Sequence, residues 1–288
     1  MSLPPPPPPA TETDSAANVC YRHPNRYAGR RCTRCGKYAC SECLVQAAVG
    51  SHCLDCARAG RPAAATRAKF WSARQPALVT MSLIAINVAV FLYVTVRDPD
   101  SLAGRLTEAQ AKLGLYEPFL AINGEWYRLV TSGFLHFGII HLAFNMYLLF
   151  LLGQMLEPAL GRIRFAFVYF ACLLGGSAGS LLIDGDAIAG GASGAVFGLM
   201  ALAFVGYWLH GANPLNTSVG TLLIMNLVLT FVFPRISVGG HVGGALAGAL
   251  CGAMVMAPRT RNIPAWARTV APIAVGALSV AISVWAVG

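Results

Sequence analysis

The chain has 288 residues, of which 56% are hydrophobic and only 11% are charged, and its formal net charge at pH 7 is +9. Soluble domains carry about 25% charged residues, so this composition, with a mean hydropathy of +0.59, excludes a wholly soluble protein and predicts a polytopic membrane protein with a smaller soluble part. Lys and Arg do not form a stripe interleaved with aromatic residues, so we expect no nucleic-acid binding. The positive charge instead points to membrane topology and anionic headgroups.

The first 17 residues begin with six consecutive prolines and continue with polar residues. They contain no apolar core segment, so we do not expect a secretory signal peptide. A proline run favours polyproline II and can dock in an SH3-like groove, but this composition is more often a disordered tail. We interpret residues 1–17 as a disordered Pro-rich tail.

Seven of the nine cysteines lie between residues 20 and 56, in ligand pairs with two residues between the partners. Four such pairs supply eight ligands, which is two tetrahedral zinc sites with no position open for catalysis. The short gap between the second and third pairs resembles B-box or RING-like fingers, in which pairs one and three share a metal, as do pairs two and four. His52 is spare, although it could replace Cys53. The predicted ligands are Cys20, His23, Cys32, Cys35, Cys40, Cys43, Cys53 and Cys56.

These residues define a predicted zinc-binding module over 18–58, holding two structural Zn²⁺ ions. About forty residues cannot bury enough apolar core to fold alone, so metal binding would supply the stability of the module. We expect it to lie in the cytoplasm and to dock a cytoplasmic protein partner. A basic juxtamembrane linker with aromatic residues, 59–75, follows it.

Seven apolar stretches beyond the linker are long enough to cross a bilayer. Basic residues gather before the first stretch and after the second and sixth, whereas acidic residues gather on the opposite side. This bias predicts a multi-pass protein of the cell membrane with its N-terminus inside and its C-terminus outside. The stretches are roughly 76–96, 138–156, 163–183, 193–210, 217–233, 239–256 and 269–287.

The loop between the first two stretches, 97–137, is long and unusually apolar. Such a loop is expected to lie in the membrane interface or to pack on the helix bundle rather than extend into water. We expect Trp126 and Arg128 to anchor it at headgroup level.

Polar residues gather at the outer ends of three stretches that cross the membrane in the same sense. Polar side chains inside a bilayer are costly and usually mark function. Ser193 lies in a Gly-Gly-Ala-Ser-Gly turn, where small neighbours allow close approach of another backbone. Glycines four residues apart after His241 favour close packing of the sixth stretch on a neighbour, and if that neighbour is the fourth stretch, His241 comes within reach of Ser193. The group comprises His136, His141, Asn145, Ser193 and His241.

This set of residues suits nucleophilic catalysis. A serine hydroxyl becomes a useful nucleophile when a base takes its proton, which neutral His241 could do. No acidic residue lies inside an apolar stretch and no His-Glu-x-x-His motif occurs, so aspartyl and zinc proteases are disfavoured and a Ser-His dyad is expected. The Ser193 N–H and the Asn145 amide could donate to an oxyanion.

The chain from about residue 76 onwards resembles the rhomboid family of intramembrane serine proteases. The resemblance rests on Trp126-x-Arg128, His136, His141-x-x-x-Asn145, the Gly191-Ala192-Ser193-Gly194 turn and Gly240-His241-Val242-Gly243-Gly244. It implies Ser193 as nucleophile, His241 as general base and His141 and Asn145 as oxyanion partners, with His136, Gly191 and Phe197 supporting the site. Many members have tyrosine where this chain has Phe197, so we expect packing alone to orient His241.

The fold implied is an all-α polytopic bundle: a six-helix rhomboid-like core over 76–257, then a linker and seventh helix over 258–288. The family implies no catalytic cofactor, and its substrates are transmembrane proteins cut near the outer end of a membrane segment. Two alternatives remain: a catalytically silent rhomboid-like protein that binds transmembrane segments, and a transporter with midplane histidines. Inverted repeats, which would support the transporter, are not evident, and the presence of both Ser193 and His241 argues against the silent protein.

Overall fold

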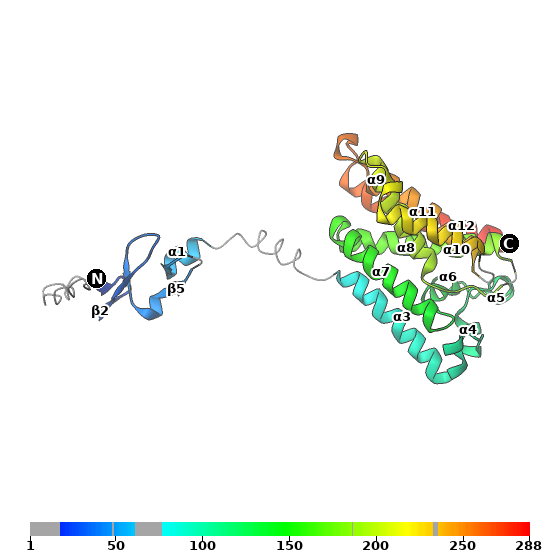
Figure 1. Ribbon diagram of the computed structural model, residues 1–288, viewed down its shortest axis with the longest axis horizontal. Helices are drawn as coiled ribbons and strands as arrows, with labels where there is room; N and C mark the ends of the chain where they lie inside the picture. Colours follow the sequence, from blue (N-terminus) through cyan, green and yellow to red (C-terminus); the bar gives the residue numbers. More distant parts are fainter. Residues whose placement is uncertain (1–17, 48, 61–76, 186, 233–235) are drawn as a thin grey trace, which may run out of the picture. The chain divides into compact units, whose positions relative to one another are not determined.

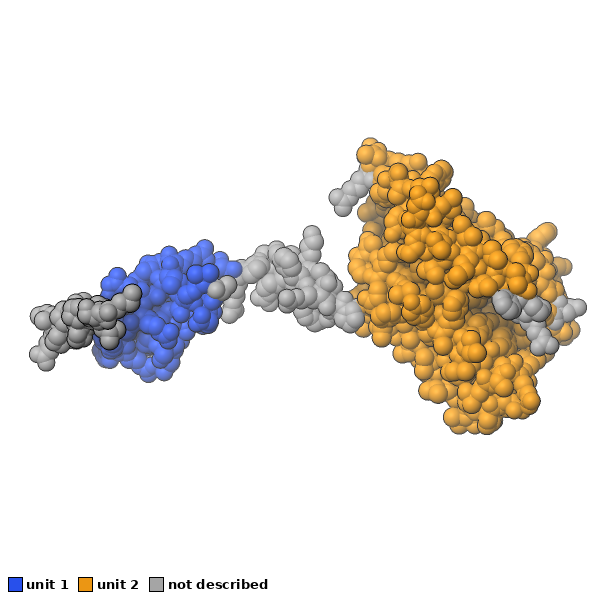
Figure 2. Space-filling model, in the orientation of Figure 1, with its two compact units in different colours: residues 1–74 blue, residues 75–288 orange. Residues whose placement is uncertain are grey.

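The computed structural model describes residues 18–47, 49–60, 77–185, 187–232 and 236–288. They belong to two compact units, residues 1–74 and 75–288, which Figure 2 shows in separate colours. The predicted Pro-rich tail lies outside the described residues, as does nearly all of the predicted linker.

Within its described residues, 18–47 and 49–60, the N-terminal unit contains three two-stranded antiparallel ladders and two short helices. Its buried apolar core is small and made largely of cysteine side chains. A unit of this size without a larger core needs another source of stability. The ladders pair β1 (Val19–Cys20) with β2 (His23–Tyr27), β3 (Arg30–Arg31) with β4 (Tyr38–Ala39), and β5 (Leu44–Gln46) with β6 (Ser51–Cys53); the helices are η2 (Ser41–Cys43) and α1 (Leu54–Ala59).

The second unit is helical, and each predicted apolar stretch coincides with one helix to within about one turn (Figure 1). By length and composition, α3, α7, α8, α11 and α12 can cross a membrane, whereas α9 and α10 are shorter apolar helices. A multi-pass membrane protein is therefore supported, and a full set of seven spans remains a prediction. The helices are α3 (Leu78–Arg97), α7 (Ile139–Leu160), α8 (Arg162–Ile183), α9 (Ser193–Leu209), α10 (Ser218–Val232), α11 (Val238–Val255) and α12 (Ala265–Val287).

The long loop between α3 and α7 packs on the bundle. Its buried leucines, Leu115, Leu120 and Leu129, form a cluster with side chains of α8 that include Leu174 and Leu181. The loop folds into short helical pieces: η3 (Pro99–Ala103), α4 (Glu108–Leu113), α5 (Glu117–Asn123), α6 (Arg128–Thr131) and η4 (Ser132–Phe134).

Arg128 is buried inside the protein, and its anchoring at headgroup level stays a prediction. It is only 3% exposed, whereas Trp126 is 37% exposed. The Arg128 guanidinium donates to the carbonyl oxygens of Ala111 (2.7 Å) and Gly114 (2.6 Å) and pairs with Glu125 at 2.6 Å. Five fixed N–H donors allow one arginine to satisfy several acceptors at once, so Arg128 ties α4 to α6 inside the loop.

A buried glutamate at the end of α7 holds the start of α3. Both oxygens of the Glu157 carboxylate accept hydrogen bonds, from the backbone N–H groups of Val79 (2.9 Å) and Thr80 (2.8 Å) and from the Thr80 hydroxyl (2.8 Å). The first N–H groups of a helix lack partners within the helix, and a negative charge is favourable there. Glu157 therefore has a structural role at the junction of α3 and α7.

Glycines bring α11 into backbone contact with α9 and α8. A Cβ at Gly244 would overlap the carbonyl of Gly194, and one at Gly248 would overlap the carbonyl of Gly198. On the α8 side, Gly239 is held equally close to Gly179. The predicted close packing of the sixth apolar stretch on a neighbour is confirmed, and its neighbours are the fourth stretch and the third.

Replacing Gly248 with valine should therefore disrupt the bundle. The new side chain would meet the backbone of Gly198, which cannot move as a flexible side chain can, so we expect a loss of at least about 3 kcal/mol of stability. Thermal unfolding in detergent measures this, and Leu246→Val, at an exposed position of the same helix, is the matched control. Equal unfolding temperatures for both variants would contradict close packing at Gly248.

Candidate active site and candidate metal centres

Ser193 is the first residue of α9, immediately after the glycine-rich turn. Gly191 in this turn has a φ of +138°, and its N–H donates to the Ser132 carbonyl at 2.9 Å. Ala192 caps the helix without a side-chain hydrogen bond. Because the first N–H groups of a helix have no intrahelical partner, the Ser193 N–H and its neighbours present donors and a positive dipole end beside the hydroxyl.

His241 lies in the first turn of α11 and is buried. Its ring stacks on Phe197, with centroids 4.0 Å apart and an interplanar angle of 17°, so Phe197 does pack against His241 as expected. Packing does not act alone, however, because Nδ1 of His241 lies 2.7 Å from Oγ1 of Thr230 on α10. Sequence reasoning missed Thr230; the only available signal was an Asn226-x-x-x-Thr230 pair in an otherwise apolar helix.

The glycines beside Ser193 and His241 bring these two residues to one level. A Cβ at Gly194 would lie 3.1 Å from the Gly240 carbonyl oxygen and 3.2 Å from Gly176 Cα, so α8, α9 and α11 meet there. Among the described residues, Ser193 Oγ makes no hydrogen bond to His241. Such bonds are often long in free enzymes and shorten when substrate binds.

His141, on α7, lies beside Gly191 in the turn that precedes Ser193. The Phe137 N–H donates to His141 Nδ1 at 3.3 Å, so the proton of the neutral ring is on Nε2. A Cβ at Gly191 would lie 2.9 Å from His141 Nε2 and 3.5 Å from Ser193 Oγ. The His141 N–H donor and the Ser193 hydroxyl therefore flank a space that only glycine leaves open.

Asn145 and His136 adjoin His141. The Asn145 amide donates one hydrogen to the His141 carbonyl at 3.0 Å, and an amide carries a second donor hydrogen. The His136 ring contacts the His141 ring edge-on at 5.0 Å. Burial, and secondarily the charge of His141, lower the pKa of His136 to about 3, so His136 is a neutral packing partner.

A small cavity of about 40 Å³ lies beside Ser193, large enough for a water molecule. Its lining combines glycines of the turn and helix crossings with several hydroxyl groups. The hydroxyl-bearing residues are Ser132, Ser177, Ser180, Ser193 and Ser237.

Asp184, at the end of α8, fixes the start of α11. Its carboxylate accepts hydrogen bonds from the Ser237 hydroxyl, from the Gly239 N–H (2.9 Å) and from the Ser180 hydroxyl (2.8 Å). Ser237 is the N-cap residue of α11, so Asp184 restrains the turn that carries His241. In the sequence, Asp184 simply follows the third apolar stretch, 163–183.

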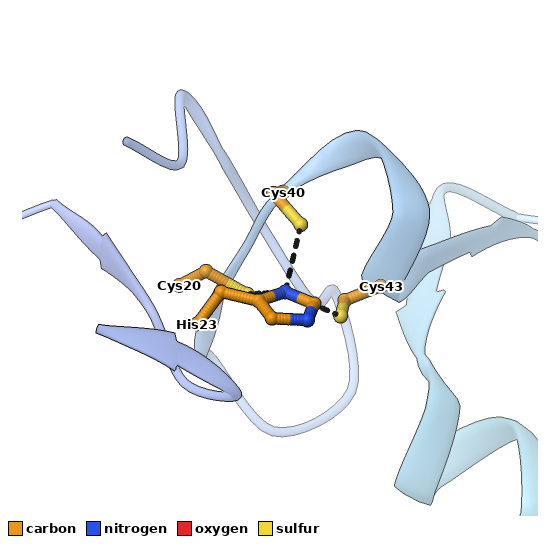
Figure 3. Close-up of side chains that lie close together, drawn as sticks. All are labelled: Cys20, His23, Cys40 and Cys43. Atoms are coloured by element: carbon orange, nitrogen blue, oxygen red, sulfur yellow. Dashed lines mark hydrogen bonds between the residues drawn. The ribbon is translucent and has the colours of Figure 1, made fainter. Parts of the chain in front are cut away.

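The cysteine-rich unit holds two tetrads of potential metal ligands, with the predicted pairing. One is Cys20, His23, Cys40 and Cys43, and the other is Cys32, Cys35, Cys53 and Cys56. In the first (Figure 3), His23 Nδ1 lies 3.7, 3.4 and 3.5 Å from the sulfurs of Cys20, Cys40 and Cys43. In the second, the sulfurs of Cys35 and Cys53 are 3.7 Å apart. Ligands around a tetrahedral zinc ion are separated by about 3.6–3.8 Å, so the residues fit zinc.

Backbone donors also favour the thiolate form that zinc requires. Burial alone would raise the pKa of the Cys20 thiol, but hydrogen bonds from the backbone of Cys40, Arg22 and His23 outweigh it and lower that pKa to about 6. The same balance lowers the pKa of Cys32 to about 6. Each tetrad therefore contains one thiol whose ionisation the backbone favours, and a bound metal ion would favour ionisation of the others, whose pKa values include raised ones.

Residues 123–258 match the model of the rhomboid domain. The chain is 34% identical over 167 residues to the Rhomboid protease GluP of Bacillus subtilis, a match covering 56% of this chain but 32% of GluP. It is 30% identical over 172 residues to the Putative rhomboid protease YdcA of the same species, covering 57% of this chain and 81% of YdcA. RHOMBOID-like protein 5 of Arabidopsis thaliana is 37% identical over 148 residues, about half of each chain.

The domain match contains all five polar residues of the candidate site and ends before α12; it does not include the cysteine-rich unit. The chain spans about a third of GluP and about half of RHOMBOID-like protein 5, but most of YdcA. On this similarity and on its apolar helices, the chain belongs to the rhomboid family of intramembrane serine proteases.

Proposed function

We propose that this protein is a serine endopeptidase that cleaves transmembrane segments of other membrane proteins near their outer ends. Ser193 is the nucleophile and His241 is the general base. The observation that supports the proposal is the glycine contact of α9 with α11, because the uncapped start of α9 bears Ser193 and the first turn of α11 bears the buried, stacked ring of His241.

The reaction follows from these groups. His241 takes the Ser193 proton as Oγ attacks the peptide carbonyl, and the resulting oxyanion accepts hydrogen bonds from the Ser193 N–H, His141 Nε2–H and the Asn145 amide. His241 then gives the proton to the leaving amine. Water attacks the acyl-enzyme with His241 again as base, and the Ser193 hydroxyl is restored. The cavity beside Ser193 provides a place for that water.

The topology and the cysteine-rich unit complete the proposal. The N-terminus lies in the cytoplasm and the C-terminus outside, in accordance with the distribution of basic residues. Two Zn²⁺ ions stabilise the cysteine-rich unit without taking part in catalysis, because each tetrad supplies four protein ligands. This unit binds a cytoplasmic protein partner.

Labelling with a fluorophosphonate tests the dyad, because the probe reacts only with an activated serine. We expect covalent labelling of the full chain in detergent, and loss of that labelling in Ser193→Ala and in His241→Ala. Ser279→Ala, which removes a buried serine of α12, is the matched control and should label normally. Undiminished labelling of Ser193→Ala would exclude Ser193 as nucleophile, and a folded wild-type protein that does not react would support a silent rhomboid-like protein.

Asn145→Ala should lower kcat by about tenfold to a hundredfold and leave KM nearly unchanged. The amide acts on charge that develops in the transition state. Loss of one oxyanion donor costs about 10²–10³ in another serine protease, and here His141 and the Ser193 N–H remain. Steady-state cleavage of a model transmembrane substrate measures both constants.

The matched control is Asn87→Ala, because the Asn87 amide makes the same kind of hydrogen bond, to the Leu83 carbonyl at 2.8 Å on α3. It should leave kcat per folded enzyme unchanged. A rise in KM alone for Asn145→Ala would show that Asn145 joins helices rather than binding the oxyanion.

A further inference from the structure

The hydroxyl of Thr230 occupies a buried position between two acceptor-capable groups. Thr230 is 2% exposed, and Asn226, one turn earlier on α10, is also buried. Thr230 Oγ1 lies 2.7 Å from the Asn226 carbonyl oxygen and 2.7 Å from His241 Nδ1. They are two of the four buried residues of α10, and the Thr230 hydroxyl is the polar group of this helix that meets His241.

One hydroxyl has one hydrogen to donate, and this decides the direction of both bonds. If Thr230 donated to His241 Nδ1, its oxygen and the Asn226 oxygen would face each other at 2.7 Å with no hydrogen between them, which is repulsive. If Thr230 donates to the Asn226 carbonyl, its lone pair is available to a hydrogen on His241 Nδ1. Only the second arrangement makes both contacts hydrogen bonds.

We propose that Thr230 is a positioning residue that keeps the proton of neutral His241 on Nδ1 and so leaves Nε2 as the acceptor for the Ser193 hydroxyl. The proposal rests on the proposed function, because it assigns a task to the base of the dyad. Thr230 touches neither substrate nor reacting atoms and acts only through His241.

The stacked ring of Phe197 cannot perform this task. Stacking fixes the plane of the imidazole ring. Both Nδ1 and Nε2 lie in that plane, so the proton can change from one nitrogen to the other while the ring stays where it is. A directional acceptor at one nitrogen is what selects a tautomer. Thr230 supplies that acceptor in a protein that has no acidic side chain bonded to His241 among its described residues.

His141 provides an internal contrast. The backbone N–H of Phe137 donates to its Nδ1, so the His141 proton lies on Nε2. The two histidines near Ser193 are thus held in opposite tautomers by neighbours of opposite hydrogen-bonding character. His141 can donate toward Ser193, whereas His241 can accept from it.

The first test reads the tautomer in the unmodified protein. In ¹⁵N-histidine-labelled full-length protein in detergent, at a pH where His241 is neutral, we expect a protonated-type shift at Nδ1 and an unprotonated-type shift at Nε2. The His241 signals are assigned by their absence from the His241→Ala spectrum. The opposite pattern, or an equal mixture of tautomers, would overturn the proposal without any need for a Thr230 variant to fold.

The second test removes the hydroxyl while keeping the shape of the side chain. Thr230→Val should lower kcat about tenfold, the effect of one hydrogen bond, with KM unchanged and with a mixture of His241 tautomers. Thr230→Ser should restore both kcat and the Nδ1–H tautomer, because it restores the acceptor. Thr221→Val, on the same helix, removes an exposed hydroxyl that also donates to a carbonyl four residues earlier, that of Thr217 just before α10. It should match the wild type.

The outcomes separate this proposal from the dyad itself. If fluorophosphonate labelling survives in His241→Ala, the dyad is wrong. If labelling depends on both Ser193 and His241 but Thr230→Val retains wild-type kcat and a pure Nδ1–H tautomer, the dyad stands and Thr230 is only a helix residue. If Thr230→Val does not fold, the His241 tautomer measured in the wild-type protein decides whether the proposal holds.

Discussion

Ser193→Ala should abolish cleavage of a model transmembrane substrate while the protein stays folded. Loss of the nucleophile costs about 10⁶-fold in kcat in another serine protease, which places the variant below detection. Among the described residues, Ser193 Oγ has no hydrogen-bond partner, so its removal leaves no buried group unsatisfied. The Ser193 N–H stays in place, because the backbone at the start of α9 is unchanged.

Cleavage of a single-pass substrate reconstituted in liposomes measures the loss, and the thermal unfolding temperature verifies folding. Ser279→Ala should cleave at the wild-type rate. Comparative membrane proteomics of cells carrying wild type or Ser193→Ala would then identify substrates, as fragments that appear only with the wild type. Wild-type cleavage by Ser193→Ala would exclude the mechanism.

Much of the fold follows from local sequence signals. Helices in a bilayer must be long and apolar, so α3, α7, α8, α11 and α12 are visible as hydropathy alone. The spacing of the glycines gives further information. Gly244 and Gly248 lie on one face of α11, which indicates that this face packs closely against the backbone of a neighbouring helix. The pairing of the ligand tetrads was also predicted, from the resemblance of the short gap between the second and third ligand pairs to B-box or RING-like fingers.

The contacts that could not be predicted join residues far apart in sequence. The sequence gives no sign that Arg128 donates to carbonyls in and just after α4, because those residues lie more than ten positions earlier in the chain. From the sequence alone, Asp184 is interpreted as a loop residue, and only the structure shows that the Ser237 hydroxyl donates a hydrogen bond to it. These partners have no common pattern in the sequence, since the bundle alone brings them together.

Thr230 shows the same limit within the candidate site. A threonine in an apolar helix commonly bonds its own backbone, and Thr230 does so at Asn226. Its second contact, with His241, depends on how α10 lies against α11. The sequence could therefore predict the dyad but not the group that we propose orients its base.

Removal of zinc should unfold the cysteine-rich unit of the full-length protein and leave the helical unit intact. The apolar core of this unit is small and largely composed of its own ligands, and zinc binding supplies about 10–16 kcal/mol in other small zinc domains. Elemental analysis should give two zinc ions per chain. After chelation, limited proteolysis should cut within residues 18–60 while the fragment from residue 77 onwards persists.

Two histidines of this unit provide a matched pair of variants. His23→Ala removes a ligand and should leave about one zinc ion per chain, whereas His52→Ala removes a histidine outside both tetrads and should keep two.

Fluorophosphonate labelling of Ser193 should persist after chelation and after deletion of residues 1–60, because four protein ligands per tetrad leave no open zinc position for catalysis. A truncated protein that is folded yet no longer labels would mean that the cysteine-rich unit is coupled to the active site. In that case its proposed role as a separate docking unit would be wrong.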